Sequence, residues 1–197
     1  GYLGQTALKT RRVCEQSVGG VLFIDEAYSL AHGDGLNVEY GRESIDTLLA
    51  FMENRRGDMA VVVAGYPEEM ANFVNANPGL RSRFDLIVHF PDYSNEELTQ
   101  ILIDLAKRKD YDFTPEALER AAAVIASWPR QRGFGNGREV RSLFNDITRR
   151  HAVLLARRNA DKHAAASTDS LRTITAEAVP QPLRLDPPAP RNHPGYL

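Results

Sequence analysis

The sequence contains a single cysteine, Cys14, in 197 residues, so no disulfide can form within the chain and a reducing compartment is expected. No apolar run approaches the roughly 20 residues that a membrane-spanning helix requires. Lysine and arginine number 24 and aspartate and glutamate 26, and the net charge of −2 gives no electrostatic reason to expect a nucleic acid or an anionic membrane as partner. We therefore expect a cytoplasmic protein without a membrane span or a nucleic-acid partner.

Two further absences narrow the possibilities. The five histidines show no metal-ligand spacing with Cys14 or with acidic residues, so a structural metal centre is not expected. The chain begins with Gly1 rather than methionine and has no basic-then-apolar signal segment, which suggests a piece of a longer protein. Its apolar content of 43% and charged content of 25% are ordinary for a globular protein, and its length can hold one large domain or two small ones.

The most informative stretch begins with two adjacent glycines, at residues 19 and 20. They introduce four large apolar residues, Val21 to Ile24, which predict a short strand buried on both faces. Two adjacent acids, Asp25 and Glu26, follow directly. Ligands in open α/β sheets collect outside the carboxyl ends of the strands, so this pair indicates a working site. The plainer alternative is a strand followed by a capped helix.

The first half of the chain alternates between apolar runs typical of strands and amphipathic segments typical of helices. Strand, helix, strand, helix, strand is the pattern of a parallel sheet in an α/β domain. The expected elements are a helix at 7–16, a strand at 21–24, a loop at 28–41, a helix at 42–54, a strand at 60–65, a helix from Pro67 that residues 77–79 end, and a strand at 86–90.

From Ser94 onward the pattern is helical. Ser94 and Glu97 form a capping box, and further helices are expected from Pro115 to before Pro129 and over 138–157. The chain then becomes rich in alanine and serine and later in proline, which is typical of a disordered tail. One short element, residues 171–179, could still dock. We expect three parts: an α/β domain at 1–93, a helical domain at 94–158 and a flexible tail at 159–197.

Five short motifs stand out together: Tyr2-Leu3-Gly4-Gln5-Thr6, Val21-Leu22-Phe23-Ile24-Asp25-Glu26-Ala27, Ala64-Gly65-Tyr66, Asn77-Pro78-Gly79-Leu80-Arg81-Ser82-Arg83-Phe84 and Phe134-Gly135-Asn136-Gly137-Arg138. In this order and spacing they resemble the AAA+ ATPases. Within them they are similar to the branch that contains stage V sporulation protein K, the red-type Rubisco activase and the cytosolic ATPase of type VII secretion. The resemblance covers residues 1–157 and implies the second half of a parallel-sheet nucleotide-binding domain followed by a helical lid.

The resemblance implies a role for each acid. Asp25 and Glu26 match the Walker B acids, of which the first helps to hold Mg²⁺, usually through water, and the second orients and polarises the attacking water. Ala64-Gly65-Tyr66 occupies the place of sensor 1, where many relatives have asparagine. The tyrosine at that position puts a polar contact to the γ-phosphate of ATP in question, and a plain strand end is the alternative.

The resemblance also implies roles for three arginines and for the start of the chain. Arg83 is placed like an arginine finger that reaches the nucleotide of a neighbouring subunit, with Arg81 as the alternative; one of the two could form only a surface salt bridge. Arg138 matches sensor 2, and its place at a helix start, where a cation is unfavourable, favours a functional role. Tyr2-Leu3-Gly4 matches the pore loop that grips substrate polypeptide in a hexameric ring, while a turn that packs Tyr2 inward is the plainer interpretation.

One expected part is absent. The sequence has no G-x-x-x-x-G-K-[S/T] loop, whose backbone N–H groups and lysine would cradle the phosphates. In the family this loop precedes the pore loop, so we expect it upstream of Gly1 and expect the chain alone to be inactive.

The resemblance implies that the full protein is a chaperone-like hexamer that hydrolyses ATP with Mg²⁺ to remodel or thread a protein partner. The alternatives are a nucleic-acid motor of the same superfamily, of the clamp-loader or branch-migration type, and a non-catalytic interaction module.

Overall fold

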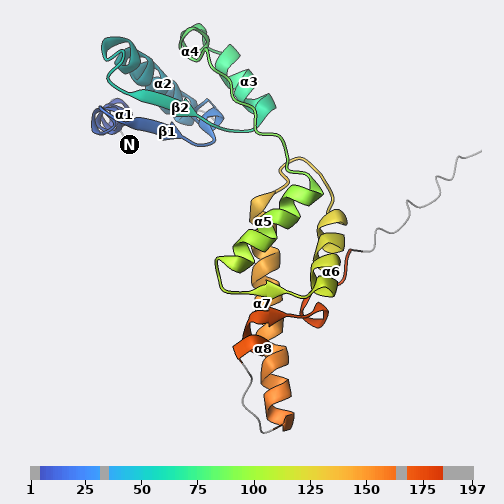
Figure 1. Cartoon of the computed structure of the whole chain (residues 1–197). Helices are drawn as coiled ribbons and strands as arrows, with labels where there is room; N and C mark the ends of the chain where they lie inside the picture. The colour runs from blue at the N-terminus through green and yellow to red at the C-terminus, as the bar shows by residue number, and fades with distance from the viewer. Residues whose placement is uncertain (1–4, 32–35, 163–167, 184–197) are drawn as a thin grey trace, which may run out of the picture. The chain divides into compact units, whose positions relative to one another are not determined.

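A computed structural model of the chain describes residues 5–31, 36–162 and 168–183. The chain divides into two compact units, Gly1–His89 and Phe90–Leu197, which we call the sheet unit and the helical unit. Figure 1 shows their elements coloured along the chain. In chain order these are α1 (Gln5–Gln16), β1 (Val21–Ile24), η1 (Ala27–Leu30), α2 (Leu36–Asn54), β2 (Ala60–Val63), α3 (Pro67–Asn75), α4 (Pro78–Arg83), α5 (Asn95–Lys107), β3 (Asp112–Phe113), α6 (Pro115–Ala126), α7 (Gly137–Lys162), α8 (Thr168–Arg172), β4 (Thr173–Ile174) and η2 (Ala176–Ala178).

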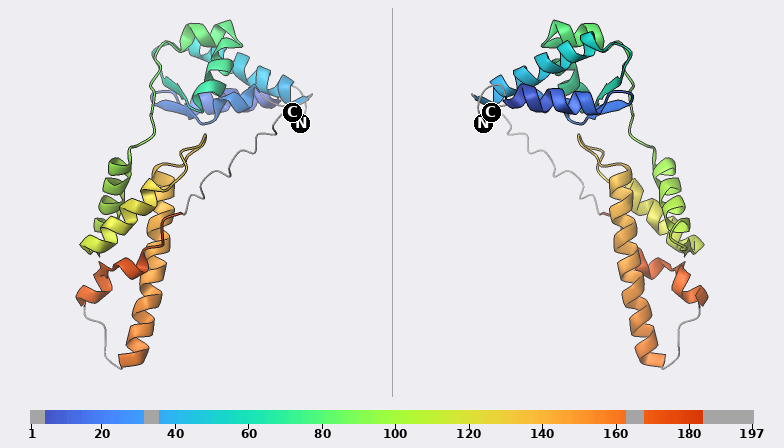
Figure 2. Two further views of the ribbon diagram at one scale, coloured as in Figure 1. Left: turned by 90° about the vertical axis from the view of Figure 1, so that its right-hand side faces the viewer. Right: turned by 90° about the vertical axis from the view of Figure 1, so that its left-hand side faces the viewer.

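The sheet unit is built on a parallel pair of strands. β1 and β2 pair with Val21 opposite Ala60 and Ile24 opposite Val63, and α2 makes the crossover between them. Helices α1 and α2 lie along the same side of the pair (Figures 1 and 2). The predicted parallel α/β arrangement is therefore confirmed. Two adjoining clusters form the core of this unit: Cys14, Leu22, Leu48 and Phe51, and Ala27, Ile45, Leu49, Phe73 and Leu80.

The other face of the strand pair is open. Val21 and Phe23 of β1 are 62% and 60% exposed, and Val62 of β2 is 43% exposed. The prediction that the strand at 21–24 is buried on both faces is therefore wrong for the part of the chain that the structure describes. A continuous apolar run predicts two covering layers, but it does not show which segment supplies the second layer.

Two predicted connections contain helix instead. Residues 28–41, expected as a loop, include part of η1 and the beginning of α2. Residues 77–79, expected only to end a helix, also begin α4, because the Asn77 side chain accepts a hydrogen bond from the Gly79 N–H at 2.8 Å and caps the new helix. The sequence at 77–79 thus contains the N-cap of α4 as well as the predicted end of the preceding helix.

The predicted third strand is wrong. Residues 86–90 form neither helix nor strand, and Leu86 and Phe90 are 80% and 90% exposed. A strand needs a neighbour to satisfy its backbone N–H and C=O groups, and no described segment pairs with this one. Its apolar, β-branched composition therefore predicted a strand that the described residues cannot complete.

The helical unit packs α5, α6 and α7 around a second core. The predicted capping box begins α5: the Glu97 N–H donates to Ser94 Oγ at 3.2 Å, and the Ser94 N–H donates to Glu97 Oε2 at 2.8 Å. Thr114 caps α6 by accepting a hydrogen bond from the Ala117 N–H. The buried residues of this core are Leu98, Leu102, Ala106, Ala117, Ala121, Val124, Ile125, Val140, Leu143, Phe144, Ile147, Ile174, Ala178 and Val179.

Packed elements continue beyond the predicted end of the helical domain. β4 pairs in parallel with β3, so the unit includes a small strand pair that the helical prediction lacked. Ile174, Ala178 and Val179 are buried in the core, and the docked element predicted over 171–179 is confirmed. Residues 184–197, predicted as tail, lie outside the described residues.

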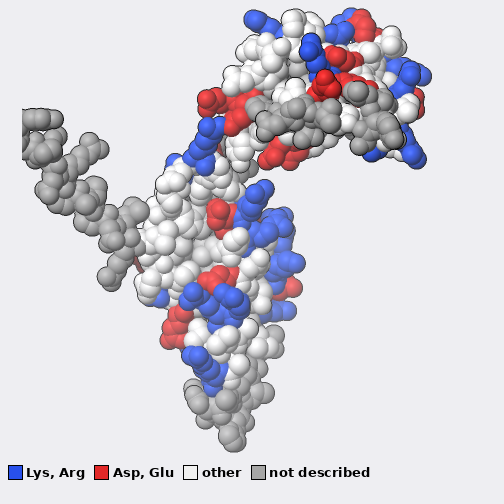
Figure 3. All heavy atoms as spheres, turned by 180° about the vertical axis from the view of Figure 1, so that it is seen from behind, with Lys and Arg blue, Asp and Glu red and all other residues white. Residues whose placement is uncertain are grey.

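Charged side chains of both signs lie on the surface of the helical unit (Figure 3). Figure 3 shows lysine and arginine grouped along one side of it, with aspartate and glutamate among them. Asp146 accepts hydrogen bonds from Arg149 at 2.6 Å and from Arg150 at 2.7 Å. Partial burial, the largest single influence, raises the pKa of Asp146, but the hydrogen bonds from the two arginines outweigh it and leave that pKa below its usual value. Within the part of the chain that the structure describes, no helix is long and apolar enough to cross a membrane.

Candidate functional site

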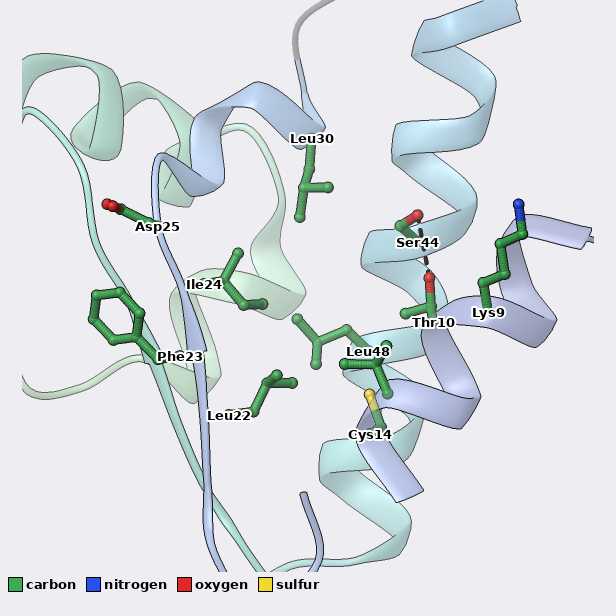
Figure 4. A pocket seen from close by; sticks show the side chains of 11 residues that line it. Lys9, Thr10, Cys14, Leu22, Phe23, Ile24, Asp25, Leu30, Ser44 and Leu48 are labelled. Atoms are coloured by element: carbon green, nitrogen blue, oxygen red, sulfur yellow. Dashed lines mark hydrogen bonds between the residues drawn. The ribbon is translucent and has the colours of Figure 1, made fainter. Parts of the chain in front are cut away.

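The two predicted acids lie at the carboxyl end of β1, where both side chains are exposed. Figure 4 shows how the strand sorts its side chains: Leu22 and Ile24 point toward α1 and α2, whereas Phe23 and Asp25 point to the other side. This alternation is the two-residue period of a strand. Asp25 therefore leaves the strand on its open face, away from the core that anchors it.

Asp25 and Glu26 are held between two hydrogen bonds to a single residue of the neighbouring strand end. The Ala64 N–H donates to the Ile24 C=O at 2.9 Å, and the Ala27 N–H donates to the Ala64 C=O at 3.1 Å. Only the two acids lie between these contacts. Their backbone is thus bonded to the end of β2 on both sides, which fixes where the carboxylates leave the sheet.

Glu26 has an uncommon backbone conformation. Its φ of 48° and ψ of 44° lie in the left-handed region, where a residue other than glycine is rare. The Glu26 N–H donates to Asp25 Oδ1 at 3.0 Å, so the first carboxylate supports the turn that directs the second. Such conformations cost about 1–3 kcal/mol and are concentrated at functional sites, where the surrounding structure maintains them.

The predicted sensor segment lies beside the acids. It follows β2, the parallel partner of β1, so Asp25, Glu26 and Tyr66 all come from the same edge of the strand pair. A Cβ atom on Gly65 would lie 2.6 Å from Tyr28 Cε1 and 2.9 Å from Met70 Sδ, so only glycine fits between them. Tyr66 itself is 43% exposed and precedes α3 in an extended conformation. Its side chain is available at the surface and takes no part in capping α3.

The two candidate finger arginines have different surroundings on α4. Arg83 is three-quarters buried: its Nη2 donates to Glu53 Oε2 at 2.9 Å, its Nη1 donates to the Gly79 C=O at 3.2 Å, and its Nε is buried without a hydrogen-bond partner among the described residues. Arg81 is exposed. The sequence did not single out Glu53, because 30 residues separate it from Arg83 and no local motif joins them.

The remaining predicted site residues lie elsewhere. Arg138 is exposed in the first turn of α7, in the helical unit, and its N–H donates to the Gly135 C=O at 2.8 Å. The predicted pore-loop residues Tyr2, Leu3 and Gly4 lie outside the described residues. The structure thus brings together the acids and the sensor segment; Arg81 and Arg83 lie on α4 of the sheet unit, and Arg138 lies on α7 of the helical unit.

A cavity of about 420 Å³ lies between β1, α1 and α2 (Figure 4). Cys14 and Leu48 line it, and the Thr10 hydroxyl donates to Ser44 Oγ at 3.3 Å across its wall. Burial raises the pKa of the Cys14 thiol, which is fully inaccessible. The cavity is therefore lined mostly by apolar side chains, with Lys9, Thr10 and Ser44 among its polar residues, and its one thiol is inaccessible.

The acids fit one mode of metal binding and not another. No group of three or more His, Cys, Asp or Glu side chains that could hold a metal ion occurs among the described residues, so a cage made by the protein alone is not found there. Asp25 keeps one carboxylate oxygen beyond the Oδ1 that accepts from Glu26. Mg²⁺ typically retains several waters and binds one or two carboxylates together with substrate phosphates, and this single exposed carboxylate suits that mode.

Each of the two units matches a family of known proteins. Residues 1–92 match the family described as ATPase family associated with various cellular activities (AAA), and residues 94–186 match the family described as AAA lid domain. The crystal structure of the FIGL-1 AAA domain superposes with a TM-score of 0.56 at 19% identity, covering 90% of this chain and 55% of that one. The shared fold is thus that of an AAA domain with its lid.

Curated relatives agree with this placement. Protein CbbX of Cereibacter sphaeroides is 44% identical over 151 residues, covering 77% of this chain and 48% of its own. Stage V sporulation protein K of Bacillus subtilis is 40% identical, with 78% and 48% covered, and the chloroplastic ribulose bisphosphate carboxylase/oxygenase activase of Cyanidioschyzon merolae is 42% identical, with 77% and 51% covered. The chain spans about half the length of these relatives. It belongs to the AAA+ family of ATPases and is similar to the sporulation-protein and Rubisco-activase branch.

Proposed function

We propose that the whole protein hydrolyses ATP and uses the cycle to remodel or thread a protein partner, as a cytoplasmic hexamer. The observation that carries this proposal is the pair Asp25–Glu26, held at the carboxyl end of β1 by two hydrogen bonds to Ala64. One relative is named an activase of ribulose bisphosphate carboxylase/oxygenase, which supports a protein as the substrate class.

The two acids divide the chemistry between them. Asp25, with an open carboxylate oxygen on the exposed face of the strand (Figure 4), would hold Mg²⁺. When bound, Mg²⁺ would neutralise charge on the phosphates of ATP. Glu26, held in a left-handed conformation directly after Asp25, would orient and polarise the water that attacks the γ-phosphate. Tyr66 at the adjacent strand end contacts the γ-phosphate or the attacking water.

Two arginines complete the proposed site, one from α4 and one from the lid. An arginine of α4 reaches the nucleotide of the neighbouring subunit and neutralises charge on the transferred group. Arg83 is the proposed finger and must exchange Glu53 for phosphate, whereas Arg81, the alternative, is exposed on the same helix. Arg138 extends from the lid to the phosphates of its own subunit. Tyr2, Leu3 and Gly4 form the loop that contacts the partner polypeptide in the central pore.

The test is Glu26→Gln in the full-length protein. The amide keeps the size and polarity of the side chain but cannot polarise water as a base, so ATP turnover is expected to fall about 10²–10⁴-fold while ATP binding is retained. Glu15→Gln is the matched control, because Glu15 is an exposed acid in the same unit whose 3.7 Å contact with Arg11 is a weak surface pair.

Turnover is measured by phosphate release and binding by titration with a fluorescent ATP analogue. A Glu26→Gln protein that keeps more than about half of the wild-type rate would refute the assignment, since removal of a general base cannot be so mild. Equal losses in Glu26→Gln and Glu15→Gln would show that the rate follows net charge in the unit and not the acid at the strand end.

A further inference from the structure

Outside the predicted site, one network of side chains ties together distant parts of the helical unit. The segment that precedes α5 is bonded to the loop between α6 and α7. Asn136 Oδ1 accepts a hydrogen bond from the Tyr93 N–H at 3.0 Å, and Asn136 Nδ2 donates to Asp92 Oδ1 at 2.6 Å and to the Phe134 C=O at 3.2 Å. One amide side chain therefore uses its acceptor and both of its donors, and two of these bonds span more than 40 residues of sequence.

Arg130 binds the same segment from a second direction. Its Nη1 donates to the Tyr93 C=O at 3.0 Å and its Nη2 donates to Asn95 Oδ1 at 2.5 Å. The guanidinium lies 4.4 Å from the centre of the Phe134 ring, which in turn packs against Trp128. Both backbone groups of Tyr93 are thus bonded to side chains of the loop between α6 and α7.

The loop leads directly into the helix that carries Arg138. Asn136 has a φ of 48°, and its C=O accepts a hydrogen bond from the Val140 N–H at 3.2 Å in the first turn of α7. A Cβ atom on Gly135 would lie 2.8 Å from Glu139 Oε1, so the Glu139 side chain of α7 packs closely over this part of the loop. Asn136 is therefore fixed both to the start of α7 and to residues 92 and 93, which precede α5 near the start of the helical unit.

We infer that Asn136, Asp92 and Arg130 form a clamp that holds Arg138 and residues 92 and 93 in fixed positions relative to one another. This inference rests on the proposed function, in which Arg138 contacts the phosphates of ATP. A movement of Arg138 toward phosphate displaces the first turn of α7, and Asn136 transmits that displacement to Asp92 and Tyr93. The three are positioning residues: they touch neither nucleotide nor water and act through Arg138.

The decisive variant is Asn136→Gly in the full-length protein. Glycine adopts a φ of 48° without strain, so the change removes the amide and keeps the backbone path. Asp92→Ala opens the same clamp from its other end. Asp110→Gly is the matched control, because Asp110 also has a positive φ, of 59°, in the turn after α5, and its side chain takes no part in the clamp.

The readout is the Kd of a non-hydrolysable ATP analogue, measured for each variant in the wild-type and in the Arg138→Ala background. A coupling of this kind is expected to weaken binding about fivefold in Asn136→Gly and in Asp92→Ala, and to leave Asp110→Gly unchanged. In the Arg138→Ala background the clamp variants should have no further effect, because residues that act through one group are not additive.

Three results would overturn the inference, and they differ in what they say of the proposed function. If Arg138→Ala leaves the Kd unchanged, the proposed contact of Arg138 with ATP fails and the clamp fails with it. If Arg138→Ala weakens binding but the clamp variants do not, only the clamp is refuted. If the clamp variants weaken binding equally in both backgrounds, they act through general stability and again the clamp is refuted. Fluorescence of Trp128 checks folding, and Asp92→Ala gives the answer if Asn136→Gly does not fold.

Discussion

Replacing Ile174 by alanine should destabilise the whole helical unit, although this residue lies in a stretch whose composition is typical of a tail. Ile174 is fully buried, and its backbone C=O accepts a hydrogen bond from the Thr114 N–H at 3.0 Å beside the short strand pair. Truncation of a buried isoleucine to alanine costs about 2–5 kcal/mol, part from lost transfer of apolar surface and part from the cavity that remains.

The size of the effect can be converted into a melting temperature. For a unit of this size, each 1 kcal/mol lowers Tm by roughly 4–8 °C, so a loss of about 3 kcal/mol lowers it by roughly 12–24 °C. Trp128 is the only tryptophan of the chain and packs against the core of the helical unit, so its fluorescence reports the unfolding of that unit.

Leu171→Ala is the matched control. Leu171 lies three residues before Ile174 and is 47% exposed, so its truncation should lower Tm by no more than a few degrees. If Ile174→Ala and Leu171→Ala shift the Trp128 transition equally, the packing of residues 171–179 contributes nothing to the fold and the reasoning from burial is refuted.

Three further predictions concern the site and the sheet unit. Arg83→Ala, which removes the proposed finger (Arg81→Ala if Arg81 is the finger), should lower ATP turnover of the full-length protein about 10³–10⁵-fold. Mixing this variant with Glu26→Gln subunits, in a ring that exchanges subunits, should restore part of the turnover; a mixture as inactive as both parents would exclude action on the neighbouring subunit. Tyr2→Ala should keep basal ATP hydrolysis and ring assembly while abolishing remodelling of the partner in an unfolding or activation assay; unchanged remodelling would contradict the pore-loop role, and unfolding of the domain would show that Tyr2 is core. Cys14, whose burial raises its thiol pKa, should react with a thiol reagent at about pH 8 at least about tenfold more slowly in the native protein than in denaturant, and similar rates would show that this core opens readily.

The sequence predicted best what depends on residues close together in the chain. Ser94 and Glu97 are three residues apart, and their capping box is present with both hydrogen bonds. The acids after Val21 to Ile24 lie at the carboxyl end of a parallel strand, as the run of apolar residues and the two glycines indicated. The capping box needs no distant partner, because three residues of spacing fix its geometry; the place of the acids follows from a local run of apolar residues, but β2 and Ala64 hold it.

What the sequence did not predict depends on partners far along the chain. Residues 86–90 have the composition of a strand, yet strand formation depends on a neighbour, which composition cannot supply. The Arg83–Glu53 ion pair joins residues 30 positions apart, and the Asn136–Asp92 hydrogen bond joins residues 44 positions apart. Such contacts follow from the fold as a whole and appear only when the elements are placed in space.

The two hydrogen bonds to Ala64 determine where the chain around the acids can tolerate changes in length. Ile24 and Ala27, on either side of the two acids, are both hydrogen-bonded to Ala64. An inserted or deleted residue between them would break one of these two hydrogen bonds, on which the direction of both carboxylates depends. An insertion after Leu30 lies outside this stretch and leaves both contacts intact. An inserted residue between Ile24 and Ala27 is therefore expected to abolish the site, whereas the same insertion after Leu30 is expected to leave the acids in place.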